Sequence, residues 1–569
     1  MIKTKSLTNN YNIETFLFCS LILILSFIEL EIRSKSLIFI ILLIFFYNYK
    51  NKDKFKFGFT FKFNKISYLI IIFIALIINQ NTYLNFEIIS IDVPSYLVAS
   101  RSINFFELPF SNQWESKGPL FIYFYRFLLL ISNNNYLFFR ILNDLLLFLI
   151  TYLIFSTSYK ISNNYFTAFI SSIFFVSITS HVWYVTELSE IYCLVFILYQ
   201  YYIISSRPIT KKTILLCGVL VSISSLINQS TAIFLIGCIF YIYKEINLKE
   251  LNYYFTLLLG FLIPQIIFYL LYFFNDLSIL YFTNYIKIPF GYVGSGEFQL
   301  YELIVWLRRY FNFSQLLYFS FLSVFFVLAI KLLKKQFFKS FRFNLNILYL
   351  ILGFLIYVIA GHNYQHHLFY TIAFFSILIS HLEINKLTSV IYVLIIFSAI
   401  HIFSFSFDKS FNNLINYEET FDNYPLRSLA SEINNLYEDK NYEVLAIDHV
   451  LLLFYLEKPN ISYIIHPFNN FEEYIVNALL ETGKLKTNDS SHLSYYIETE
   501  PEIIICAPQT IIDGSPTKLG SDIFNCEITD YKKNYIKLDT QIYLDNPNRE
   551  YYYNPYISID VFIKTKDSS

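Results

Sequence analysis

Residues 92–120 read DVPSYLVASRSINFFELPFSNQWESKGPL, a polar stretch in a chain otherwise rich in long apolar runs. Its charged side chains include two carboxylates, Asp92 and Glu115, and two cations, Arg101 and Lys117. Charges are costly inside a bilayer, so a charged stretch between apolar runs indicates a loop at the membrane surface. This stretch is therefore the first candidate for a functional site.

The composition predicts a polytopic α-helical membrane protein. Of the 569 residues, 56% are hydrophobic and only 15% are charged, and the mean hydropathy is +0.48. This composition is too apolar for an ordinary soluble globular protein. The formal net charge is −1, so no basic field favours nucleic acid, and we expect no nucleic-acid partner.

The apolar runs predict about thirteen transmembrane helices, several of them shorter than the roughly 20 residues that a perpendicular span needs. The runs lie near residues 14–32, 36–49, 66–81, 137–158, 164–181, 187–206, 213–227, 229–243, 253–274, 313–330, 345–361, 366–382 and 388–406.

Basic residues are concentrated in alternate connections, which the positive-inside rule places in the cytoplasm. The connection from Lys50 to Lys65 carries six lysines, and five basic residues lie between 331 and 342. By contrast, the turns 182–186 and 362–365 carry no Lys or Arg. This bias predicts a multi-pass protein of the inner membrane with a cytoplasmic N-terminus. The segments expected on the outer face are the loop 82–136, the loop 275–312, the turn 361–367 and the C-terminal tail.

The apolar runs stop after residue 406, which divides the chain into two predicted domains. Residues 1–406 form a transmembrane domain with its catalytic outer loop at 82–136, and residues 407–569 form a small soluble extracytoplasmic α/β domain. Strands are expected at 442–448, 502–507 and 556–564, and helices at 426–438 and 471–481. Cys506 and Cys526 lie in this domain, where an extracytoplasmic location permits a disulfide that spacing alone does not establish.

Proline positions predict two short helices in the candidate loop. Pro94 suits the first turn of a helix over 94–106, with Asp92 at its amino end facing water. On that helix Tyr96, Ile103 and Phe106 are expected to lie on the membrane. Pro119 starts a second apolar helix that ends near residue 131 and is too short to span a bilayer.

The pattern of the loop resembles a known family. Asp92 and Tyr96 form a D-x-x-x-Y, Arg101 follows, and residues 117–120 form a K-x-P-L before an aromatic-rich helix. This arrangement is similar to GT-C glycosyltransferases of the protein O-mannosyltransferase and lipid A aminoarabinose transferase type. The chain has Gly118 where the usual K-P-P-L has its first proline.

The resemblance implies inverting transfer of a sugar from a polyprenyl-phosphate carrier to a glycan, lipid or protein acceptor. In that interpretation Asp92 is the general base, Glu115 orients a cation or the acceptor, and Tyr96 positions substrate. Residues implied for the donor phosphate are Lys117, Arg101, Arg308, Arg309 and His366. The alternatives left open are a helix cap for Asp92 and contacts with lipid head groups for the basic residues.

Two further groups of polar residues lie at predicted outer membrane boundaries. The turn 361–370 carries His362 and His366, for which an interfacial role, a phosphate contact and a zinc site all remain open. No cofactor is required by the pattern, although a divalent metal is compatible with it. Charged residues in the outer turns of helices predict a polar cleft beneath the loop: Arg140, Asp144, Glu187 and Glu190.

The placement of charge also separates the competing functions. No Asp, Glu, Lys or Arg lies near the middle of a predicted span, whereas ion-coupled transporters hold polar groups at the midplane. A flippase, transporter or polymerase of lipid-linked glycans remains the alternative to a glycosyltransferase, because its polar groups can also lie near one face.

Overall fold

The computed structural model describes residues 64–79, 92–104, 106–180, 187–206, 208–246, 250–305, 315–333, 340–362, 364–382, 386–416, 425–437, 441–485, 492–506, 511–512, 515–516, 535–538 and 559–565.

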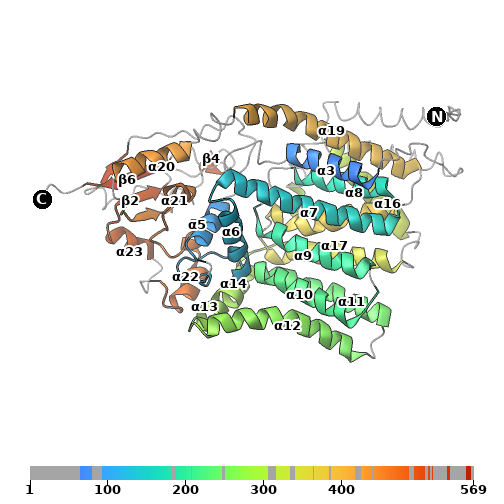
Figure 1. Ribbon diagram of the computed structural model, residues 1–569, viewed down its shortest axis with the longest axis horizontal. Helices are drawn as coiled ribbons and strands as arrows, with labels where there is room; N and C mark the ends of the chain where they lie inside the picture. Colours follow the sequence, from blue (N-terminus) through green and yellow to red (C-terminus); the bar gives the residue numbers. More distant parts are fainter. Residues whose placement is uncertain are drawn as a thin grey trace.

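A bundle of apolar helices makes up most of the protein (Figure 1). Its members are α3 (Lys65–Asn79), α7 (Tyr136–Ser162), α8 (Tyr165–Thr179), α9 (Ser189–Ser206), α10 (Lys211–Ile227), η1 (Gln229–Phe234), α11 (Leu235–Ile246), α12 (Leu251–Phe273), α16 (Gln315–Leu333), α17 (Phe341–Ala360), η3 (Gln365–Leu368), α18 (Phe369–Leu378), η4 (Ile379–His381) and α19 (Lys386–Ile415). Each predicted span from 66–81 onward coincides with helix, because long apolar runs satisfy their backbone hydrogen bonds within the segment.

Three described helices are long and apolar enough to cross a membrane: Tyr136–Ser162, Leu251–Phe273 and Phe341–Ala360. Five shorter helical stretches are also apolar. The predicted spans 14–32 and 36–49 lie outside the described residues, so the total of about thirteen stays a prediction.

Glycines bring two helices of the bundle into backbone contact. A Cβ on Gly218 of α10 would lie 2.4 Å from the carbonyl oxygen of Leu257 in α12, and one on Gly260 would lie 2.3 Å from that of Leu215. Only a residue without a side chain fits at these distances. The exposed face of α12 is apolar, as expected of a helix that contacts lipid.

Short helices cap one end of the bundle, next to the sheet (Figure 1). They are α5 (Asp92–Arg101), α6 (Pro119–Ile131), α13 (Ser278–Phe282), η2 (Thr283–Lys287) and α14 (Ile288–Ser295). The predicted helix from Pro119 to about 131 is confirmed. The helix predicted for 94–106 is shorter, because the backbone N–H of Asn104 is bonded to the Glu107 side chain, which stabilises a turn instead.

The outward face predicted for the first helix is wrong in part. Tyr96 and Ile103 are both buried inside the protein, whereas Phe106 is 99% exposed. Nearly every side chain of α5 is buried, so the helix lies between other elements and not on the membrane surface.

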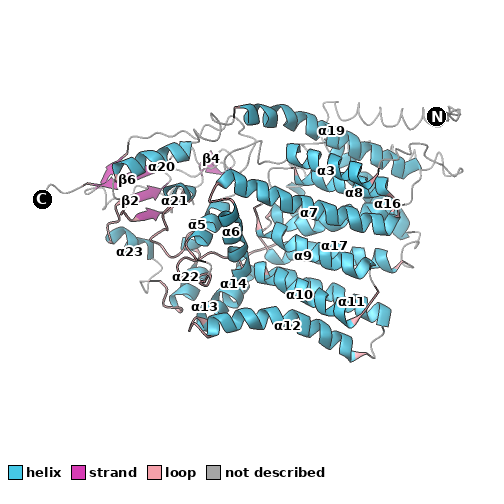
Figure 2. Ribbon diagram, in the orientation of Figure 1, coloured by secondary structure: helices cyan, strands magenta, loops and turns pink. Residues whose placement is uncertain are grey.

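The C-terminal part contains a small four-stranded sheet (Figure 2). Its order is β1 (Val444–Ala446), β2 (Ile503–Cys506), β6 (Asp560–Lys564) and β5 (Tyr535–Lys537), with β1 and β2 parallel and the other pairs antiparallel. β3 (Ile511–Ile512) and β4 (Ser515–Pro516) pair separately. The helices here are α20 (Pro425–Leu436), α21 (Leu451–Leu456), η6 (Phe468–Phe471), α22 (Glu473–Leu480) and α23 (His492–Glu498).

Both faces of the sheet are covered. Ile503 and Ile505 pack into the large core that continues from the helical bundle, while Ile504 and Cys506 pack into a second, smaller core. The predicted strands β1, β2 and β6 and helices α20 and α22 are all present, with shorter bounds. Cys506 is disulfide-bonded, and Cys526 lies outside the described residues.

Candidate functional site

The C-terminal part docks directly on the candidate loop through its backbone. Trp114 forms an isolated parallel bridge with Ile464, in which the Trp114 N–H donates to the Tyr463 carbonyl at 2.7 Å. The Gln113 side chain donates to the carbonyl of Asn460 at 2.7 Å, and the Tyr463 hydroxyl donates to that of Phe110 at 2.6 Å. These bonds fix both segments, so residues that follow each of them face a common site.

Asp92 is the first residue of α5, and its carboxylate is paired with a histidine from the C-terminal part. His466 Nε2 lies 3.0 Å from Asp92 Oδ1. The side chain of His466 is 8% exposed and that of Asp92 is 27% exposed. Asp92 is therefore the member of the pair that a molecule from outside can reach.

Asp92 and His466 shift each other's pKa. Burial would raise the pKa of Asp92, but the hydrogen bond and charge of His466, with a contribution from Lys117, hold it well below its usual range. Burial would lower the pKa of His466, but the bond and charge of Asp92 outweigh this and raise it. Asp92 is thus ionised at any physiological pH.

Glu115 is the second carboxylate of the loop and is 1% exposed. Its Oε1 accepts hydrogen bonds from the backbone N–H and the hydroxyl of Ser116, at 2.7 and 2.8 Å. Its Oε2 has no hydrogen-bond partner among the described residues. Burial raises the pKa of Glu115, and the charge of His466 and the Ser116 bonds oppose this only in part.

Lys117 is the cation nearest these acids. Its charge acts on both Asp92 and Glu190, yet in the described part of the chain it makes no ion pair or hydrogen bond. Its ammonium lies 5.9 Å from the centre of the Tyr96 ring. A cation close to acids but not bonded to them is available for an anionic ligand.

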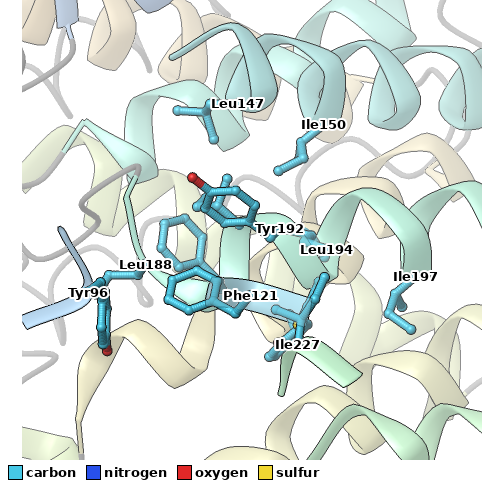
Figure 3. Packing of buried hydrophobic residues seen from close by; sticks show 14 of the residues in the cluster. Tyr96, Phe121, Leu147, Ile150, Leu188, Tyr192, Leu194, Ile197 and Ile227 are labelled. Atoms are coloured by element: carbon cyan, nitrogen blue, oxygen red, sulfur yellow. The ribbon is translucent and has the colours of Figure 1, made fainter. Parts of the chain in front are cut away.

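Tyr96 supports this cation from inside the protein. Its ring packs edge-on against Phe121 at 5.0 Å, and Phe121 packs likewise against Tyr192 (Figure 3). Tyr96 is 1% exposed, so its ring lies on the buried side of the Lys117 ammonium. The role predicted for it, contact with substrate, stays a prediction.

A third acid and two histidines complete the cluster. Glu190 lies in the first turn of α9, and His366 and His367 belong to η3. His367 Nδ1 is 3.2 Å from Glu190 Oε1, and one ligand atom from each of the three residues lies within 4.8 Å of the others. Asn228 also donates to Glu190 Oε1, at 3.3 Å. One carboxylate and two imidazoles are a set of donors that suits zinc.

His362, by contrast, is turned away from the cluster. Its Nε2 lies 3.2 Å from the carbonyl oxygen of Tyr292, and its ring stacks on the Tyr292 ring at 4.2 Å. The zinc interpretation of the sequence, which paired His362 with His366, is therefore wrong in its first ligand. The neighbouring residue His367 takes that place.

The glycine that departs from the K-P-P-L pattern is explained by crowding. The N–H of Gly118 donates to the carbonyl of Ile227 at 3.0 Å. A Cβ at Gly118 would lie 2.2 Å from the carbonyl oxygen of Leu226. A proline would therefore lose a hydrogen bond and collide with the end of α10.

Other predicted residues lie elsewhere. The guanidinium of Arg101 donates to the carbonyl of Phe454 at 2.6 Å and pairs with Glu457 at 3.1 Å, so it is engaged in docking the C-terminal part. Arg308 and Arg309 lie outside the described residues.

Arg140 pairs with Glu187 at 2.7 Å, and both are buried, which removes Glu187 from the expected open cleft.

Sequence reasoning missed His466 and His367. His466 is separated from Asp92 by 374 positions, and no local pattern connects them. His367 adjoins His366 in the sequence, but the choice between His362 and His367 depended on which side of the turn faces Glu190.

No protein-family model matches the sequence, and no curated protein matches it. Among solved structures, the chain is similar to the archaeal oligosaccharyltransferase AglB from Archaeoglobus fulgidus, in complex with an inhibitory peptide and a dolichol-phosphate. The similarity has a TM-score of 0.46 at 11% sequence identity, and it covers 79% of this chain and 70% of that one.

The crowding at Gly118 predicts that restoring the proline harms the protein. We expect Gly118→Pro and Gly118→Ala to lower the free energy of unfolding by at least about 1 kcal/mol, because both place a Cβ against α10. Thermal unfolding of the purified protein in detergent measures this. Gly294→Ala is the matched control, since a Cβ there meets nothing within 4 Å. An unchanged melting temperature for Gly118→Pro would contradict the account.

The donor set of Glu190, His366 and His367 predicts binding of a divalent metal. Calorimetric titration of the purified protein with Zn²⁺ should give one site per chain. Glu190→Gln and His367→Ala should each weaken it by at least about tenfold, as loss of a ligand or its close partner does. His362→Ala should bind as tightly as the wild type. Equal affinity in all four proteins would show that the cluster holds no metal.

Proposed function

We propose that the protein is a membrane glycosyltransferase of GT-C type that transfers a sugar from a polyprenyl-phosphate carrier to an acceptor. The observation that carries the proposal is the convergence of Asp92, Lys117 and His366 at one end of an apolar bundle. The charge of Lys117 acts on Asp92, and the charges of both act on His366. An acid and a cation next to lipid-facing helices fit a substrate that is half lipid and half sugar phosphate.

Asp92 is the general base in this proposal. The acceptor hydroxyl is a weak nucleophile, and a carboxylate within hydrogen-bond reach takes its proton as the new bond forms. Asp92 is ionised and partly exposed, which are the two properties that this role requires. The acceptor oxygen attacks the anomeric carbon from the face opposite the phosphate, so the configuration is inverted.

Lys117 and His366 would bind the leaving group. The bond from the anomeric carbon to the phosphate oxygen breaks with its electron pair, so negative charge grows on the phosphate. Asp92 and Glu190 lie close by and would repel that charge. Lys117, which is not bonded to either acid, and a cation held by Glu190, His366 and His367 would counter this repulsion.

Glu115 is proposed as an orienting group. Its Oε2 is buried without a hydrogen-bond partner among the described residues, and burial of such an atom is costly unless a ligand supplies the bond. A sugar or acceptor hydroxyl that donates to Oε2 would satisfy it.

The remaining parts of the proposal follow the predicted topology. The bundle would lie in the inner membrane of a bacterium with the N-terminus in the cytoplasm, and the site and C-terminal domain on the outer face. The lipid-linked sugar would then enter from the bilayer, and the acceptor would enter from the aqueous side.

The test is transfer of a labelled sugar from a polyprenyl phosphate by the purified protein. Asp92→Asn should lower the rate by about 10²- to 10⁴-fold, the usual contribution of a general base. Asp276→Asn is the matched control, because Asp276 is an exposed residue with φ 58° that asparagine also tolerates.

Three outcomes would contradict the proposal in different ways. A wild-type rate for Asp92→Asn would remove Asp92 as the base. An equal loss in Asp276→Asn would indicate a general effect on folding. Movement of lipid-linked glycan across vesicles, without any transfer by the wild type, would favour the flippase alternative.

A further inference from the structure

His466 is held at the site by the docking of the C-terminal part on the loop and by a bond within its own segment. The bridge between Trp114 and Ile464 lies two residues before it. The N–H of Ile465 points to the Trp114 carbonyl at 3.4 Å, and Asn470 donates to the His466 carbonyl at 3.1 Å. The ring therefore has a fixed place behind Asp92.

The ring of His466 has one hydrogen bond among the described residues, and Asp92 is its partner. Nε2 makes that bond, while Nδ1 is buried and has no hydrogen-bond partner in the part of the chain that the structure describes. An imidazole that served only to join two surfaces would be expected to use both nitrogens. The hydrogen bond of the ring therefore acts on the Asp92 carboxylate.

Charged groups from several elements act on this ring. Asp92 at the start of α5 and Glu115 in the loop favour the protonated imidazole, and Lys117 opposes it. The charge of His366 in η3 acts on Asp92. The two acids outweigh burial and Lys117, so the pKa of His466 is raised above its usual value. The imidazole therefore keeps its proton to a higher pH than an ordinary histidine does.

We propose that His466 is a positioning residue that makes the soluble domain part of the catalytic centre, by holding Asp92 in place and setting its basicity. This inference rests on the proposed function. When the ring is charged, Asp92 is tied in an ion pair and has little affinity for the acceptor's proton. When the ring is neutral, the hydrogen bond still orients Asp92, but the carboxylate is a stronger base.

The direction of the pH dependence follows from this. Above the pKa of His466, the acceptor's proton passes to Asp92 as the bond to the anomeric carbon forms and the bond to the phosphate breaks. Below that pKa the same step is slower, because the protonated ring competes for the carboxylate. Transfer should therefore rise with pH, with a midpoint above the ordinary histidine pKa of about 6.5.

Two substitutions separate orientation from charge. His466→Gln keeps a donor for Asp92 but cannot become charged, so the fall in kcat/KM at low pH should move down by more than about one pH unit. His466→Phe keeps the ring volume and loses the bond, so its kcat/KM should be lower at every pH, with no midpoint near neutrality. His362→Gln is the matched control, since His362 contacts Tyr292 and not Asp92, and its profile should equal that of the wild type.

The measurement is kcat/KM for sugar transfer between pH 5.5 and 9 with the full-length proteins, each first shown to elute as a single folded species. If His466→Gln has the wild-type pH profile, the inference is wrong and the proposed function stands. If His466→Phe transfers at the wild-type rate, His466 does not position Asp92. If the wild type transfers no sugar at any pH, the proposed function fails and the inference fails with it.

Discussion

The site depends on the balance of charge among carboxylates that are largely removed from water. Asp92, Glu115 and Glu190 lie near one another at the end of an apolar bundle, where an unbalanced acid is costly. His466, Lys117 and His367 supply that balance from three separate segments. Among the described residues, Lys117 has no ion pair or hydrogen bond and Glu115 Oε2 accepts no hydrogen bond, so a polar substrate would gain most at these two places.

Much of the architecture follows from keeping those segments together. Backbone bonds between Trp114 and the strand-like segment 463–465 attach the C-terminal part to the loop. Arg101, bonded to Phe454 and Glu457, reinforces that attachment. Lys287 of η2 pairs with Glu481 at 2.5 Å, which joins the short helices η2 and α14 to the same C-terminal part. The C-terminal part thus lines one side of the candidate site, and Gly118 permits the loop to reach the end of α10.

The helices could be predicted from the sequence because an apolar run of sufficient length forms a helix whatever its neighbours. Asp92, Lys117 and His366 could be proposed from local sequence patterns, and the structure brings them near one another, while their roles stay predictions. His466 could not be found, since only tertiary docking brings it to Asp92. Arg101 was assigned to the phosphate because an arginine that docks a domain and one that binds an anion look alike in sequence. The sequence predicts Glu190 at the membrane boundary. Its pairing with His367 could not be predicted, because it depends on which side of the turn 361–367 faces α9.

The central claim is that the cluster around Lys117 binds the phosphate of a lipid carrier. Photocrosslinking with a polyprenyl phosphate that carries a reactive group beside the phosphate tests it most directly. The account predicts labelled peptides that contain Lys117 or His366, and loss of this labelling in Lys117→Ala or with excess unlabelled polyprenyl phosphate. Labelling confined to the lipid-facing surface of α12, unaffected by Lys117→Ala, would contradict it.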